Sequence, residues 1–219
     1  MSGGALGEKR RHASPPRPRR PARPLAAHPH GWIDIRTELV VDDAGRVEAL
    51  RQAWLFDEFY SAFMLDDFAQ AGLEREEGLG ELLRQDVEAL APFDDFTRVE
   101  VTGEPQEFDA VRAYANGVAR GRIRFRFELP LAEPVDPTGS ELRYAVFDPT
   151  YQIELLHQGE PRVRLPRALA GRCAVEVIAP DPPAESVSLA AMLERTEEAW
   201  DGLGAQVAEW VELRCAPPR

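Results

Sequence analysis

Residues 33–41 constrain the fold most strongly, because mostly apolar side chains at the odd-numbered positions alternate there with mostly polar side chains at the even-numbered ones. The odd-numbered positions are Ile33, Ile35, Thr37, Leu39 and Val41. Such alternation is the period of a β-strand with one buried and one exposed face. The ordered part of the chain is therefore expected to begin with a half-buried strand whose inner face needs a covering layer.

Residues 1–26 have a different character, because prolines and basic side chains dominate and few apolar side chains could be buried. We expect this stretch to be a disordered leader. It has the basic start and the small-residue site of an export signal, at Leu25-Ala26-Ala27, but lacks the 7–15-residue apolar segment between them. It is therefore an atypical signal region or the product of a wrongly assigned start. Residues 27–219 are expected to form a single α+β domain.

The charge is divided unevenly along the chain. The net charge is −12 overall, but residues 1–27 carry +6 and the remainder carries −18. An acidic body argues against nucleic acid as a partner, since phosphate binding needs a concentrated basic surface. It is compatible with the handling of cations. The sequence has no apolar run of about 18 residues, so we expect a chain that does not span a membrane.

Turn and periodicity signals place further elements along the chain. A turn at 42–45 leads into a returning strand at 46–56, and helices are expected near 59–68, 79–90 and 187–196. Phe59, Phe63 and Phe68 form an aromatic stripe that we assign to the core. The predicted fold class is α+β, an antiparallel β-sheet or sandwich built from hairpins with two or three helices packed on it.

Asn116-Gly117 is the strongest hairpin signal and predicts a two-residue turn. That register places Asp109 opposite Arg124. The outgoing strand carries an arginine ladder on one face, made of Arg120, Arg122, Arg124 and Arg126. The ladder either docks an acidic partner or is a solvated face neutralised by acids of the neighbouring strand.

Two histidines directly precede the first strand and are the best candidates for metal binding. His28 and His30 are two residues apart, so in an extended chain they share a face about 6.6 Å apart. Neutral imidazoles and carboxylates are zinc ligands. The acids that could join them are Asp34, Asp57, Glu58 and Asp148. Competing interpretations are solvated histidines, a helix cap at Asp57 and a turn opener at Asp148.

Other kinds of site have weaker support. His157 stands alone at the end of a predicted strand, so we expect a surface histidine there. The sequence has no G-x-S-x-G motif, no cysteine near a histidine and no phosphate-binding glycine loop, so we expect no enzyme. The two cysteines, Cys173 and Cys215, are either a disulfide or two buried thiols.

Several motifs, taken in order, resemble the DUF1007 family. They are Ala27-His28-Pro29-His30 with Trp32-Ile33-Asp34, then Trp54-x-Phe56-Asp57-Glu58, Phe147-Asp148-Pro149-Thr150-Tyr151, Gly171-Arg172-Cys173 and the late Cys215. The resemblance covers about residues 26–215. It departs from the family pattern at Gly31, where a bulky apolar residue is usual.

The resemblance implies a periplasmic component of an ABC-type transport system, associated with an integral-membrane metal permease of the nickel/cobalt type. It implies a Cys173–Cys215 disulfide and a metal site at His28 and His30, completed by Asp57, Glu58 or Asp148. Zinc is the expected ion, with nickel, cobalt and copper as alternatives. The competing hypothesis is a non-metal interaction module that docks on the permease.

Overall fold

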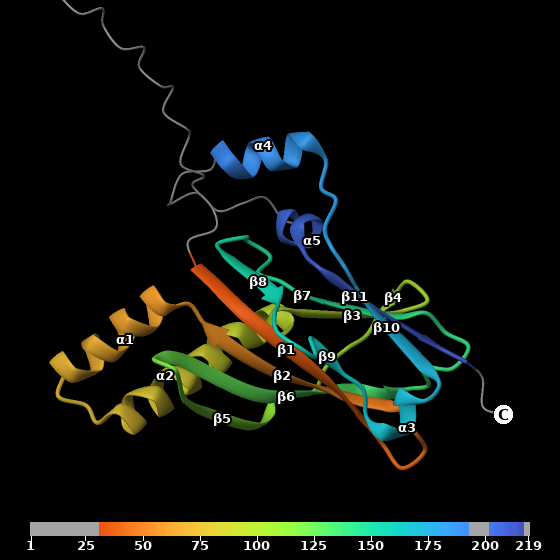
Figure 1. The fold of residues 1–219 in the computed structure, drawn as a ribbon, viewed down its shortest axis with the longest axis horizontal. Coiled ribbons are helices and arrows are strands. Elements are labelled where there is room, and N and C mark those ends of the chain that lie inside the picture. Colours follow the sequence, from red (N-terminus) through yellow and green to blue (C-terminus); the bar gives the residue numbers. More distant parts are fainter. Residues whose placement is uncertain (1–30, 193–201, 217–219) are drawn as a thin grey trace, which may run out of the picture.

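Two β-sheets form the body of the protein in the computed structural model, which describes residues 31–192 and 202–216 (Figure 1). The strands are β1 (Gly31–Val41), β2 (Val47–Phe56), β3 (Thr97–Val101), β4 (Glu104–Pro105), β5 (Arg112–Ala119), β6 (Arg122–Val135), β7 (Leu142–Val146), β8 (Ile153–His157), β9 (Val163–Arg164), β10 (Cys173–Ile178) and β11 (Trp210–Cys215). The helices are α1 (Glu58–Gln70), α2 (Arg75–Leu90), the 3-10 helix η1 (Ala91–Phe96), α3 (Arg167–Ala170), α4 (Ala184–Met192) and α5 (Leu203–Val207). The first sheet has the order β5-β6-β2-β1-β8 with β9 beside β1, and the second has the order β10-β11-β7-β3-β4.

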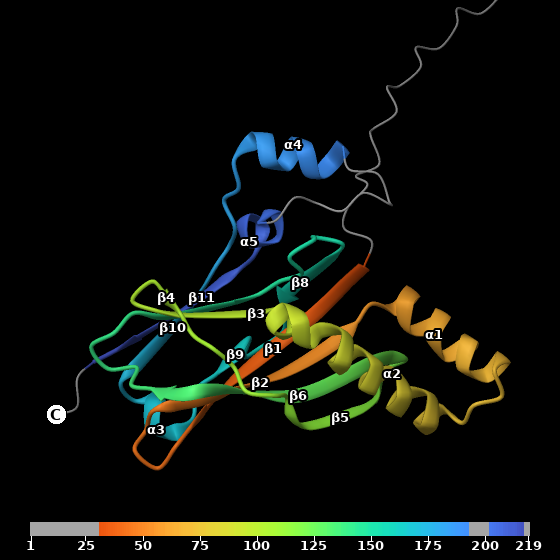
Figure 2. The ribbon, with the colours of Figure 1, turned by 180° about the vertical axis from the view of Figure 1, so that it is seen from behind.

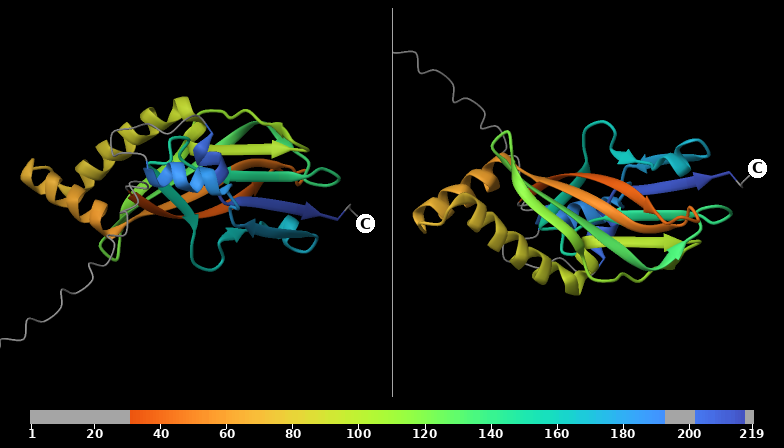
Figure 3. Two further views of the ribbon diagram at one scale, coloured as in Figure 1. Left: turned by 90° about the horizontal axis from the view of Figure 1, so that it is seen from above. Right: turned by 90° about the horizontal axis from the view of Figure 1, so that it is seen from below.

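The inner face of the first sheet is covered by two different layers. Ile33 and Ile35 of β1 and Phe125 of β6 are buried in one apolar core together with Tyr144 and Val211 of the second sheet. Figure 2 shows α2 lying across β2 and β6, where its Leu79, Leu82 and Leu83 are buried. The two views of Figure 3 show the helices α1 and α2 gathered at one end of the layered strands. The opposite face of the first sheet therefore remains available to solvent.

A buried polar network joins the two sheets. Gln52 of β2 is fully buried, and its Nε2 donates to Thr97 Oγ1 of β3 at 2.7 Å while its Oε1 accepts from Trp54 Nε1 at 2.8 Å. Thr97 Oγ1 in turn donates to the carbonyl of Asp95 at 3.0 Å. Buried polar groups need such partners, because an unsatisfied one costs about 1–3 kcal/mol.

A disulfide links Cys173 to Cys215, as the family resemblance predicted. The two residues are cross-strand neighbours at the ends of β10 and β11, where they form the last pair of the ladder. The bridge closes the antiparallel β10–β11 pair at an outer edge of the second sheet.

The predicted α+β class is confirmed, since two antiparallel-rich sheets carry helices. One departure from a hairpin-only sheet is that β1 pairs in parallel with β8 and β9. Helix α2 starts at Arg75, ahead of the helix expected at 79–90. Helix α4 includes the first residues of the helix expected at 187–196, whose last residues lie outside the described ranges. No helix in the described part of the chain has the length and apolar character needed to cross a bilayer.

The predicted hairpin register is wrong. The turn between β5 and β6 is at Arg120-Gly121, whose φ angles are +53° and +80°, rather than at Asn116-Gly117. Two residues with positive φ are what a two-residue turn of this type requires, and glycine adopts that conformation without steric cost. Gly117 lies within β5 opposite Arg124, so Asp109 does not face that arginine.

The aromatic stripe on α1 is also mostly outside the core. Phe68 is buried, but Phe59 is 86% exposed and Phe63 is 63% exposed. The helix packs through its opposite side, where the buried Ser61 accepts a hydrogen bond from the Ile123 backbone N–H of β6 at 2.9 Å. Two large aromatic side chains are consequently left on the surface.

His157 is buried rather than exposed, contrary to the sequence-based prediction. Its ring Nδ1 lies 3.1 Å from a carboxylate oxygen of Glu209, which also accepts the His157 backbone N–H at 2.7 Å. Burial alone would raise the pKa of Glu209, but the hydrogen bonds from His157 outweigh it and hold that pKa below its usual value. The pair ties β8 to the segment that leads into β11.

Candidate functional site

The start of β1 is the first place where predicted site residues meet. His28 and His30 lie outside the described residues, so the structure begins at Gly31, the next position along the chain. Here β1 lies between β2 and β8, with Gly31 paired to Ile153 and Ile33 paired to Phe56. The end of β2 and the loop before β8 therefore border the entrance of β1.

Asp57 follows β2 and lies directly beside this entrance. Its Oδ1 accepts the Tyr60 backbone N–H at 2.8 Å, so it caps α1 as the alternative interpretation held. Its Oδ2 is 3.4 Å from the Trp32 backbone nitrogen and 3.8 Å from where a Cβ on Gly31 would stand. One carboxylate oxygen thus caps the helix, while the other faces the beginning of β1 and accepts the Trp32 backbone N–H.

Asp148 lies near the same entrance but its carboxylate is fully engaged. The residue is 4% exposed and accepts four hydrogen bonds, from Thr150 N, Thr150 Oγ1, Gln152 N and Ile153 N, at 2.7–3.0 Å. These bonds shape the turn that delivers β8 to β1. A metal could bind this carboxylate only at the expense of that turn, so we assign Asp148 a structural role.

Glu58 is exposed and lines a pocket whose charged residues are mostly arginines. Asp34 also lines that pocket, and its carboxylate forms an ion pair of 2.7 Å with the Arg122 guanidinium. Its negative charge is therefore already balanced within the protein. Within residues 31–192 and 202–216, no three His, Cys, Asp or Glu side chains are grouped closely enough to hold a metal. Of the predicted acids, Asp57 is therefore the one that lies directly beside the start of β1 and has no ion pair in the described part of the chain.

An apolar groove of about 390 Å³ borders the same entrance. Gly31, Trp32, Asp57, Phe59 and Phe63 are among its lining residues. Trp32 is 50% exposed, and with the two exposed phenylalanines of α1 it forms what we call the aromatic surface. Clustered exposed aromatics are uncommon on an isolated protein and typically mark an interaction site.

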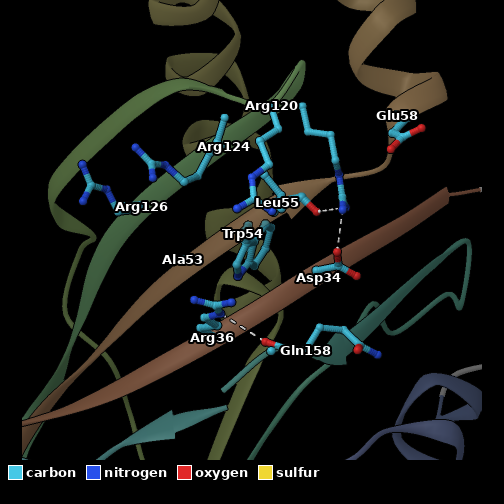
Figure 4. A pocket seen from close by; sticks show the side chains of 13 residues that line it. Asp34, Arg36, Ala53, Trp54, Leu55, Glu58, Arg120, Arg124, Arg126 and Gln158 are labelled. Carbon is cyan, nitrogen blue, oxygen red and sulfur yellow. Dashed lines mark hydrogen bonds and ion pairs between the residues drawn. The ribbon is translucent and has the colours of Figure 1, made fainter. Parts of the chain in front are cut away.

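The second concave feature is the arginine pocket, a cavity of about 610 Å³ on the outer face of the first sheet. Five arginines and two acids are among its lining residues: Arg36, Arg120, Arg122, Arg124, Arg126, Asp34 and Glu58. Figure 4 shows Arg120, Arg124 and Arg126 on one side and Arg36 on the other, across Ala53 and Leu55. The ladder predicted from the sequence therefore lines a hollow rather than a flat face.

Arg122 differs from the other arginines of the pocket because its donors are used within the protein. It donates to Asp34 and to the carbonyl oxygens of Phe56 and Leu55 at 2.5–2.9 Å. Among the residues that the structure describes, no carboxylate lies within 4.0 Å of the guanidinium groups of Arg36, Arg120, Arg124 or Arg126. Four of the five positive charges are therefore without a close counterion there.

The family model described as "Protein of unknown function (DUF1007)" matches residues 20–215. The chain belongs to the DUF1007 family. An uncharacterized protein of Haemophilus influenzae (strain ATCC 51907 / DSM 11121 / KW20 / Rd) is 21% identical to this DUF1007 chain over 198 residues, which cover 87% of this chain and 92% of that protein. Neither description states an activity, a ligand or a partner.

Sequence reasoning did not include Arg36 in a site with the ladder of this DUF1007 protein. Arg36 lies on β1, and its Nε donates to the Gln158 carbonyl at 3.1 Å. The available signal was the period of two, since Arg36 occupies an outward-facing position of the first strand. That signal gives the face of the sheet but not the strand order β6-β2-β1 that brings Arg36 opposite Arg126.

Proposed function

We propose that this DUF1007 chain is a periplasmic metal-binding accessory protein of a membrane metal transport system, with zinc as the cargo. The ion would be bound by His28, His30 and Asp57, with Glu58 as an alternative carboxylate ligand. The observation that supports this is the position of the Asp57 carboxylate, 3.8 Å from a Cβ on Gly31. Because consecutive Cα atoms are about 3.8 Å apart, the residue before Gly31 would be within side-chain reach of that carboxylate.

The donor set fits zinc chemically. Two imidazoles and one carboxylate are three ligands of the kinds that zinc accepts, and a fourth position would stay open to water or to a receiving ligand. An ion in transit needs such a site, since a closed tetrahedral set releases zinc slowly. Nickel, cobalt and copper also accept imidazole, so a titration has to compare them.

The location is supported by the disulfide between Cys173 and Cys215. Disulfides persist in oxidising compartments such as the bacterial periplasm and are rare in the cytosol. The aromatic surface of Trp32, Phe59 and Phe63 borders the proposed metal site. We propose that the membrane permease contacts this aromatic surface. The bound metal ion would then lie next to the permease.

The test is calorimetric titration of the full chain with zinc. We expect a dissociation constant below about 10 µM, which corresponds to roughly −7 kcal/mol. The double variant His28→Ala/His30→Ala should lose binding. Asp57→Asn should weaken it by about tenfold or more with only a small change in melting temperature, because asparagine caps helices about as well as aspartate and the contact that is lost is the long one from Trp32 N.

A matched control is Asp42→Asn, which removes one carboxylate charge from the turn at the other end of β1. It should bind zinc as the wild type does. Equal isotherms for the wild type and the double histidine variant would refute the metal site.

The second candidate function is a non-metal module that docks on the permease. It is favoured by the exposure of Phe59 and Phe63. Replacing both with serine should abolish association with the detergent-solubilised permease, and for a non-metal module the wild type should show no zinc binding in the titration above. If the permease binds the variant as before, the aromatic surface is not the docking site.

A further inference from the structure

The outer face of the first sheet contains two neighbouring rows of residues that differ in charge: one alternates acids and arginines, and the other has arginines without acids. The first row runs Glu38, Arg51, Glu128 and Arg112 across β1, β2, β6 and β5. Its signs alternate, and ion pairs of 3.5, 2.7 and 2.9 Å join each residue to the next. Burial alone would raise the pKa of Glu128, but hydrogen bonds from both arginines outweigh it and lower that pKa. This row is neutralised from within.

The next row, two residues along β1, β2 and β6 and three along β5, where the register shifts, has no acid. Arg36 of β1 faces Ala53 of β2, and Ala53 faces Arg126 of β6, which faces Ala115 of β5. Beside it, Arg124 lies between Leu55 and Gly117. Arginines thus occupy the places where the neighbouring row has acids, and alanines the places where it has arginines, so the row has positive charge with small residues between the charged ones.

The surroundings make this concentration of charge costly in the absence of a ligand. Like charges in one pocket repel each other, and a solvated surface would have no need to place them together. The remainder of the chain after residue 27 carries a net −18, so acids are plentiful in composition, but of the two in the pocket lining Asp34 is paired with Arg122 and Glu58 forms no ion pair with the other four arginines. Arginine clusters without protein counterions are a recurring basis of phosphate and carboxylate recognition.

We propose that the arginine pocket binds a small oxyanion carrying two or more negative charges, either a polycarboxylate or a phosphate. Arg36, Arg124 and Arg126 would contact it, with Arg120 at the rim. Arg122 would act as a support, because Asp34 and two backbone carbonyls already hold it.

The dimensions favour a small multivalent ligand. A volume of about 610 Å³ is within the range of small-molecule sites, about 300–1,000 Å³. Arg124 and Arg126 are two residues apart on one strand, about 6.6 Å, and Arg36 lies two strands away, about 10 Å from β6. Guanidinium groups that converge from these positions can engage separate charged groups of one ligand. Since this set of residues is distinct from His28, His30 and Asp57, the proposal is independent of the metal site.

The experiment is calorimetric titration of the full chain with citrate and, separately, with inorganic phosphate at low ionic strength. Binding of either one supports the pocket, and the stronger of the two identifies the chemical source. Arg36→Gln and Arg126→Gln, at two exposed positions, should each weaken binding roughly tenfold or more, the effect of losing one charge-assisted hydrogen bond. Binding should also weaken as salt is added.

Arg112→Gln is the matched control, because it removes the same charge from the same face but from the self-neutralised row. It should bind as the wild type does. Equal weakening in Arg112→Gln and Arg126→Gln would overturn the proposal in favour of general charge attraction. Absence of binding by the folded wild type with both anions would also overturn it, as would binding confined to an acidic peptide.

Discussion

Removal of the Cys173–Cys215 disulfide should lower the free energy of unfolding by about 4 kcal/mol. The two cysteines are 42 residues apart, and the chain-entropy relation for a loop of this length gives about 13 cal/mol/K, or about 4 kcal/mol at 25 °C. The native pairing of β10 with β11 should persist without the bridge, because six residue pairs form the ladder and the cysteines are only the last of them. The loss should therefore arise mainly in the unfolded chain.

The assay is thermal unfolding followed by circular dichroism, comparing the oxidised wild type with Cys173→Ala/Cys215→Ala. For a domain of this size 1 kcal/mol corresponds to about 2–4 °C, so the melting temperature should fall by roughly 8–16 °C. A reductant should lower the melting temperature of the wild type by a similar amount and leave the double variant unchanged. A fall of less than about 3 °C would refute the loop-entropy reasoning, and a reductant effect on the double variant would show that another process is being measured.

Gly78→Ala should destabilise the protein relative to Gly80→Ala, although both lie in α2, because a Cβ at residue 78 would be 2.5 Å from the Phe68 ring whereas nothing lies within 4 Å at residue 80. Helix propensity contributes equally to both variants, so the difference in unfolding free energy isolates the steric cost of about 1–3 kcal/mol; equal stabilities would contradict the close packing of α1 on α2. Because His157 holds the pKa of Glu209 below its usual value, this carboxylate stabilises the fold above about pH 4.5, and the stabilisation is lost as the pH falls through the lowered pKa. Urea unfolding between pH 6 and pH 3 should show a steeper loss for the wild type than for Glu209→Gln, and parallel curves would rule out the coupling.

The strands and the inner faces could be predicted because alternation is a local property. Ile33, Ile35 and Leu39 are buried as the period of two requires, and the predicted second strand ends at Phe56 as observed. Asp57 was recognised both as a cap and as a candidate ligand, since its place between a strand and a helix is visible in the sequence. These inferences need only neighbouring residues.

Inferences that depend on distant parts of the chain were less successful. The Asn116-Gly117 signal is real as a local preference, but the register is set by where β5 can pair with β6, and the positive φ angles fall at Arg120-Gly121. Phe59 and Phe63 have core-like character, yet α1 extends beyond the sheet and turns them outward. His157 could not be placed without Glu209, which approaches it from 52 residues away.

The arginine pocket illustrates the same limit. The four arginines of the ladder could be predicted to share a face because they lie on one strand. The acids that were expected to neutralise them were assigned from the wrong hairpin register. In the structure Arg124 faces Gly117 and Arg126 faces Ala115. The charges on one face of a sheet neutralise each other only when opposite charges lie side by side on neighbouring strands. Which residues lie side by side depends on the strand order and register.

The parallel pairing of β1 with β8 has a consequence for how the protein assembles. Gly31 meets Ile153, so the strand that opens the fold acquires its second neighbour only after a long intervening stretch has been made. Pairings between such distant segments slow folding, because the entropy of closing the loop is lost before the contacts form. β1, next to the edge of its sheet, therefore lacks its β8 neighbour until residues 153–157 have been synthesised, so the first sheet is completed late in the production of the chain.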